Sequence, residues 1–120
     1  MPRHLITILI AALFPIALAW AGVSLKLGAH PFWDVKTALI GAPIGGLVGM
    51  LVSMKLPRTA SVLIFAILTF AAYAVAHWGK STFAASYAED ALAGKVWFFG
   101  WIATSGAFAA LIAAILAKRG

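Results

Sequence analysis

The amino-acid sequence predicts an all-α integral membrane protein, a single-domain bundle of four transmembrane helices with very little soluble mass. Of its 120 residues, 64% are hydrophobic and only 10% are charged, with a mean hydropathy of +1.04. Soluble domains are about 45–50% apolar and about 25% charged. A soluble fold of this size buries only roughly 60–70% of the surface that its unfolded chain exposes. Such a chain cannot hide this much apolar surface from water, so we expect a membrane protein.

The charged residues set the limits of the four expected helices. A Lys, Arg or Asp at the centre of a membrane span costs about 2.5–3.5 kcal/mol, so spans lie between charges. Four uncharged stretches are long enough to cross a hydrocarbon core of about 30 Å, which takes about 20 helical residues. The expected transmembrane helices are therefore 5–25, 36–54, 59–79 and 95–117.

The first expected helix, 5–25, follows Arg3 and contains Pro15 near its middle. A proline inside a helix removes one backbone donor and frees the carbonyl four residues earlier, here that of Ala11. The apolar run with Ala17-Leu18-Ala19 also resembles a cleavable signal peptide. We expect the segment to be retained as a membrane helix.

The second expected helix, 36–54, carries the clearest motif of the sequence, a glycine zipper. Small residues recur every four positions on one helical face: Gly41, Gly45, Gly49 and Ser53. Membrane helices associate through close backbone approach along such faces. The motif therefore predicts a tight helix-packing interface, either inside the chain or at the seam of a homo-oligomer or hetero-complex.

The connection to the third expected helix, 59–79, is the four-residue link Lys55-Leu56-Pro57-Arg58, which predicts a tight antiparallel hairpin of the two helices. The segment from Lys80 to Lys95 is expected to be the longest loop. Its alanine-rich stretch 83–88 is a candidate short surface helix.

The fourth expected helix, 95–117, has small residues on two faces, one with Gly106, Ala110 and Ala114, the other with Ala103 and Ala107. Polar residues lie at a similar mid-membrane depth on the last two helices: Thr69, Thr104 and Ser105. This set can line a polar path or form hydrogen bonds between helices, and the second role is the simpler expectation.

Aromatic residues gather toward one membrane interface, where all five tryptophans are expected: Trp20, Trp33, Trp78, Trp97 and Trp101. Such an aromatic belt anchors a protein among lipid headgroups, or it forms a platform for a lipid tail, quinone, pigment or partner helix. His30 and His77 lie at the same interface. The candidate cofactor-binding residues are accordingly His30, His77, Trp78, Trp97 and Trp101, although polar interface residues are the simpler interpretation. We expect no bound metal and no cofactor.

Several function classes are disfavoured by what the sequence lacks. It has no cysteine, no Ser/His/Asp set, no zinc motif and no paired mid-membrane carboxylates, so we expect no enzyme. No charged residue lies well inside a span, where ion-coupled transporters usually keep one. The net charge of +6 is expected to face anionic lipid headgroups, and no basic aromatic surface for nucleic acid is present.

The distribution of charge also predicts an orientation. Five cations lie on the side of the chain ends: Arg3, Lys55, Arg58, Lys118 and Arg119. Four cations lie on the other side, where three carboxylates largely cancel them: Asp34, Glu89 and Asp90. The positive-inside rule therefore places both termini in the cytoplasm, in a protein of the bacterial inner membrane.

The expected function is that of a non-enzymatic accessory or assembly subunit, which joins a larger membrane complex through helix packing. Its expected partners are membrane lipids and other membrane proteins, or further copies of itself. Two alternatives remain open: a small oligomeric channel or facilitator for an uncharged or weakly charged solute, and a protein that binds a quinone, pigment or lipid.

Overall fold

The computed structural model describes residues 3–23, 26, 34–86 and 90–117. This part of the chain forms four helices and no strand: α1 (Arg3–Trp20), α3 (Asp34–Ser53), α4 (Arg58–Ala85) and α5 (Ala91–Leu116). Each of the four is long and apolar enough to cross a membrane. The predicted fold class, an all-α bundle of four membrane-spanning helices, is confirmed.

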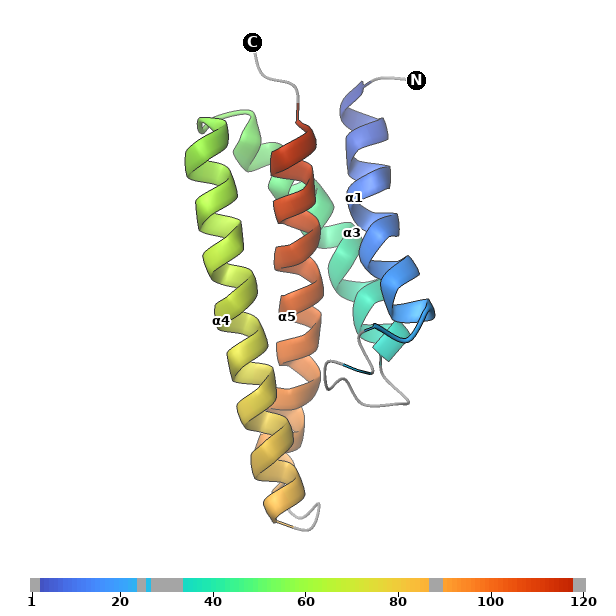
Figure 1. The fold of residues 1–120 in the computed structure, drawn as a ribbon, viewed down its shortest axis with the longest axis vertical. Coiled ribbons are helices and arrows are strands. Elements are labelled where there is room, and N and C mark those ends of the chain that lie inside the picture. Colours follow the sequence, from blue (N-terminus) through green and yellow to red (C-terminus); the bar gives the residue numbers. More distant parts are fainter. Residues whose placement is uncertain (1–2, 24–25, 27–33, 87–89, 118–120) are drawn as a thin grey trace.

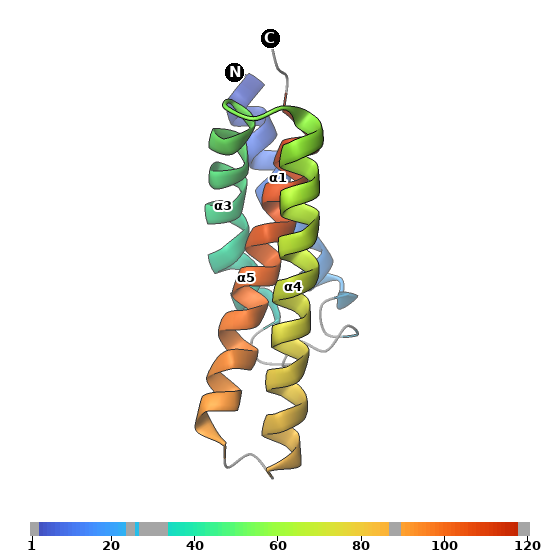
Figure 2. The ribbon, with the colours of Figure 1, turned by 90° about the vertical axis from the view of Figure 1, so that its left-hand side faces the viewer.

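Helix α5 lies at the centre of the bundle (Figures 1 and 2). It packs along α4 on one side and along α3 on another, while α1 packs mainly on α3 and less on α5. The described ends Arg3 and Ala117 lie at the same end of the bundle, as an even number of spans requires (Figure 1).

The expected tight hairpin of helices 36–54 and 59–79 is wrong. The two are joined by a short turn, yet α3 and α4 make few contacts because α5 lies between them. The physical reason lies in α5, whose small residues let both helices approach its backbone more closely than they approach each other.

Helix α1 ends at Trp20, five residues before the expected limit. Gly22 has a positive φ of 88°, a conformation that costs L-residues with a Cβ atom about 1–2 kcal/mol and is readily adopted by glycine. Its N–H donates to the carbonyl of Ala19 at 3.0 Å, and the N–H of Ala21 donates to Ala17 at 2.9 Å. These bonds satisfy carbonyls of the last turn, so the chain turns before the next charged residue.

Helices α4 and α5 are longer than expected, and together they project past α1 and α3 at the end away from the termini (Figure 2). They contain 28 and 26 residues, about 42 and 39 Å at 1.5 Å per residue, against 18 and 20 residues in α1 and α3. The stretch expected as a separate surface helix is part of α4 as far as Ala85, while residues 87–88 lie outside the described residues.

The connection between α4 and α5 is held by two side chains. The Ser86 hydroxyl donates to the carbonyl of Phe83 at 2.8 Å and accepts from the N–H of Asp90 at 2.9 Å. The Asp90 carboxylate then caps α5 by accepting from the N–H of Ala93 at 3.0 Å. Both helices can therefore continue beyond Lys80 and Lys95, which the sequence analysis had placed at the edges of a loop.

Candidate functional site

The glycine stripe of α3 packs against α5 of the same chain. A Cβ atom added at Gly41 would meet the carbonyl oxygen of Ile102, and one at Gly45 would meet that of Gly106. One added at Gly49 would lie 2.5 Å from the Cα atom of Ala110. The stripe thus lies on the small face of α5 formed by Gly106 and Ala110, and the contact lies within one chain.

Ser53, the last member of the stripe, is also buried against the bundle, and so is Ser61 at the start of α4. Neither hydroxyl has a hydrogen-bond partner among the described residues. On a neighbouring face of α3, a Cβ atom at Gly46 would lie 3.2 Å from the carbonyl oxygen of Ile8, so α1 approaches there. Helix α3 therefore presents small residues to two neighbours.

A second close interface joins α4 and α5, and the sequence analysis did not identify it. Trp97 and Trp101 are 8% and 5% exposed and pack with Ala76. A Cβ atom at Gly79 would lie 2.5 Å from the backbone nitrogen of Trp97, and one at Gly100 would lie 2.8 Å from Ala76. The signal in the sequence is the alternation of large aromatic and small residues at helical spacing, at positions 93, 97, 100, 101 and 104 of α5.

The aromatic residues expected at one interface have two different roles in the structure. Trp20 and Trp78 are exposed, at 81% and 53%, and can face lipid or headgroups. Trp97 and Trp101 instead fill the seam between α4 and α5, where Trp97 packs on Phe83 and Trp101 on Tyr73. Trp33 lies outside the described residues. The described tryptophans therefore do not form a single aromatic platform.

Of the candidate cofactor-binding residues, Trp97 and Trp101 lie in one buried cluster with Ala76, and Tyr73 contacts both Trp101 and His77. His77 is exposed and stacks on Tyr73, with ring centroids 6.4 Å apart, while His30 lies outside the described residues. The exposed side chain of Trp78 lies apart from the buried Trp97 and Trp101. Within the described ranges, no group of three or more His, Asp or Glu side chains could hold a metal ion.

The mid-membrane polar set does come together. Thr69 of α4 and Thr104 and Ser105 of α5 line one cavity of about 220 Å³, on the side of α5 that faces α1. The Thr69 hydroxyl donates to the carbonyl of Phe65 and the Thr104 hydroxyl to that of Gly100, each at 2.7 Å. These bonds stay within each helix, so the two threonine protons do not join the helices together.

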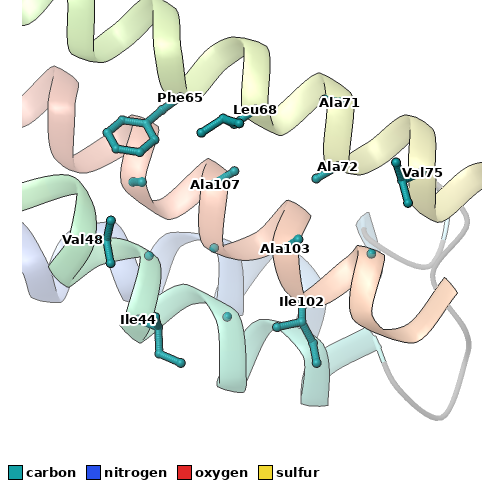
Figure 3. Close-up of a pocket in the computed structure, with 15 residues that line it drawn as sticks. Ile44, Val48, Phe65, Leu68, Ala71, Ala72, Val75, Ile102, Ala103 and Ala107 are labelled. Atoms are coloured by element: carbon teal, nitrogen blue, oxygen red, sulfur yellow. The ribbon is translucent and has the colours of Figure 1, made fainter. Parts of the chain in front are cut away.

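A larger apolar groove lies on the roughly opposite side of α5, between α3 and α4 (Figure 3). Its volume is about 540 Å³. Ile44 and Val48 of α3 form one wall, and Phe65 and Leu68 of α4 form the other. Small residues of α5 form the floor: Gly100, Ala103, Gly106, Ala107 and Ala110.

The groove follows the floor helix from Gly100 to Ala110, about 15 Å at 1.5 Å per residue. No charged or hydroxyl-bearing side chain lines it among the described residues. The structure therefore offers two distinct surfaces beside α5, an apolar groove and a smaller cavity with hydroxyl groups. Comparisons with known protein families, curated proteins and solved structures find no match for this chain.

Proposed function

We propose that this protein is a non-enzymatic accessory subunit of a larger membrane complex, and that the groove between α3 and α4 receives a transmembrane helix of a partner protein. The observation that carries the proposal is the groove itself, an apolar recess about 15 Å long whose floor has almost no side chains. Small residues allow the backbones of membrane helices to approach closely, and this packing drives their association in lipid.

The position of the glycine stripe of α3 supports the groove as the partner site, because the stripe already packs against α5 of the same chain. Gly41, Gly45 and Gly49 are buried against the backbone of α5, and Gly41 and Gly45 also border the groove. On the floor of the groove, Ala103 is exposed and Ala107, one turn further along, is half-buried; Ala71 of α4 is a further exposed small residue of the groove. We infer that a partner would contact Ala103 and Ala107, whereas from the sequence alone the stripe itself was a candidate contact, inside the chain or between chains.

The interior of the bundle argues against the channel alternative. The centre is occupied by α5, whose backbone is in close contact with α3 and α4. A conduit needs polar groups along its whole length to replace the hydration of a solute. The hydroxyl groups that line the cavity between α1 and α4 lie at one depth, in Thr69, Thr104 and Ser105, and do not continue along the bundle as a path.

The proposed location is the bacterial inner membrane with both termini in the cytoplasm. Arg3, Lys55 and Arg58 lie at the end of the bundle where the chain begins and ends, and Arg58 donates to the carbonyl of Ala117 at 2.9 Å. Reporter fusions after Leu56, Ser86 and Gly120 test this orientation. A reporter active only outside the cytoplasm should work after Ser86; activity after Leu56 and Gly120 instead would reverse it.

The assembly proposal is tested by enlarging a groove residue. Ala103→Leu places a larger side chain on the exposed floor of the groove, where it can extend without disturbing the bundle. Ala74→Leu makes the same change at an exposed position of α4 that does not line the groove, and is the matched control.

Tagged protein is purified from membranes in mild detergent, and co-purifying proteins are quantified by mass spectrometry. We expect a stoichiometric membrane partner with the unmodified chain and with Ala74→Leu, and at least a tenfold loss with Ala103→Leu. No stoichiometric partner, or equal recovery with all three proteins, would contradict the proposal. A cross-linked dimer of the chain that Ala103→Leu removes would make the partner a second copy. Solute flux through liposomes well above protein-free liposomes would favour the channel.

A further inference from the structure

The cavity on the α1 side of α5 has the features of a ligand site, and it lies near the middle of α4 and α5 and beside the last turn of α1. It lies where α1 and α4 both approach α5 but make almost no contact with each other. Thr69 is near the middle of α4, and Thr104 is near the middle of α5. A molecule dissolved in the bilayer could therefore reach the cavity sideways, between α1 and α4.

The hydroxyl groups of the cavity offer both kinds of hydrogen-bonding group. The protons of Thr69 and Thr104 are used for carbonyls of their own helices, so their oxygens are left as acceptors. Ser105 is only 6% exposed and lines the same cavity. Its hydroxyl group can therefore donate to a ligand oxygen in the cavity.

The walls and the size of the cavity narrow the class of ligand. Trp101 and Phe108 of α5 and Pro15 of α1 supply flat apolar surfaces. The volume of about 220 Å³ exceeds the roughly 150 Å³ of an apolar cavity that takes up benzene. Because no charged side chain lines the cavity in the described residues, a charged ligand would lie unpaired in the membrane. The space suits one substituted, uncharged six-membered ring.

We propose that this cavity binds the ring of a membrane-soluble quinone or quinol, with Ser105 as donor to a ring carbonyl and Thr69 and Thr104 as acceptors for a ring hydroxyl. The alkyl tail of such a molecule would leave between α1 and α4 into the lipid. This site lies on the other side of α5 from the partner groove, and it does not depend on the proposed assembly function.

The test uses the full-length protein in lipid nanodiscs and a short-chain ubiquinone analogue as the probe. Quinones quench tryptophan fluorescence, and Trp101 lies in the wall of the cavity, so bound probe should give saturable quenching. Ser105→Ala removes the donor and keeps the space, and it should weaken binding about three- to tenfold, as the loss of one hydrogen bond does. Ser105→Leu fills the cavity and should abolish saturable quenching.

Two variants at other positions of the chain make the binding test specific. Thr69→Val removes a hydrogen-bond acceptor from α4 without a change in the shape of the side chain, and it should also weaken quinone binding. Thermal unfolding shows whether Ser105→Leu folds. If it does not fold, Thr69→Val still tests the proposal. Ser61→Ala removes a buried hydroxyl outside the cavity and should leave binding unchanged.

A second probe separates recognition of the ring oxygens from simple filling of space. Decylbenzene has a ring and a tail but no oxygen, so its dissociation constant, measured from how far it reverses the quenching by the quinone, should be at least tenfold higher than that of the quinone. Quenching that does not saturate, or that is equal in all variants, would overturn the proposal, because the probe would then only dissolve in the bilayer. Loss of binding in Ala103→Leu with retention in Ser105→Leu would also overturn it, since the ring would then occupy the apolar groove.

Discussion

Gly45→Ala should strongly destabilise the bundle, although it adds only one methyl group. The new Cβ atom would meet the backbone of Gly106, with the Gly106 Cα atom at 2.6 Å and its carbonyl carbon at 2.5 Å. Ordinary contacts begin at 3.4 Å, so α3 and α5 would have to separate by about 0.9 Å to clear the carbonyl carbon, and by more to clear the carbonyl oxygen, which is closer. The new methyl group would meet only backbone atoms of α5, so no side chain could rotate away to make room for it.

The free-energy cost of Gly45→Ala follows from the rigidity of this backbone contact. Overpacking typically costs 1–3 kcal/mol, and occasionally more. Separation of the two helices at Gly45 would also loosen the contacts of Gly41 and Gly49 along the same stripe. We therefore expect about 2–3 kcal/mol for Gly45→Ala, which lowers the folding equilibrium constant about 30- to 160-fold.

Gly94→Ala is the matched control, because a Cβ atom there would meet only the ring of Phe83, at 3.1 Å, and a ring can turn. Alanine is also the better helix former, by about 0.8–1 kcal/mol in water, and this benefit is shared by both variants. Reversible unfolding by added SDS in bicelles, followed by circular dichroism, measures both free energies. Equal stability of the two variants would refute the close contact between α3 and α5.

Three further changes can be measured in the same unfolding assay. Trp97→Ala leaves a cavity in the seam of α4 and α5, and we expect a loss of about 3–5 kcal/mol; a loss under about 1 kcal/mol would mean that Trp97 is not buried. Ser61→Ala removes a buried hydroxyl without a partner among the described residues, so stability should stay equal or rise by up to about 1 kcal/mol, and a clear loss would show that the hydroxyl has a partner. Asp90→Ala removes the N-terminal cap of α5 and should lower the free energy of unfolding by about 1 kcal/mol. Asp90→Asn should keep most of this capping energy; an equal loss of stability in both variants would mean that the carboxylate acts by charge.

The sequence predicted the number and approximate place of the helices because charge and hydropathy determine where a chain can cross lipid. It predicted their ends less well. Gly22 ends α1 through a positive φ, and Ser86 and Asp90 let α4 and α5 continue past Lys80 and Lys95 into a segment that has four charged residues in the sequence. These are local hydrogen-bonding effects, and a search for uncharged windows does not detect them.

The arrangement of the helices was harder to predict for a different reason. A short link suggests that the helices on either side of it pack together, but in this bundle the surface of α5 decides the neighbours. The spacing of Gly41, Gly45 and Gly49 identified a close interface and not its partner, because many alanine-rich faces in this chain could receive it. Likewise, Thr69, Thr104 and Ser105 were grouped by depth alone, and the structure adds that they face one cavity.

The composition of α5 explains why the two cavities exist. Its small residues point in every direction around the helix, with Gly106 and Ala110 toward α3 and Gly100 toward Ala76 of α4. Where these small residues lie the helix is thin, so α3 and α4 can each touch its backbone. Because α3 and α4 both pack on α5, they remain apart from each other on one side of it, and α1 and α4 remain apart on the other side. The apolar groove and the hydroxyl-lined cavity are the spaces left between them. A central helix with small residues where it meets its neighbours therefore produces close packing and lateral openings together, and the side chains that line each opening determine what can occupy it.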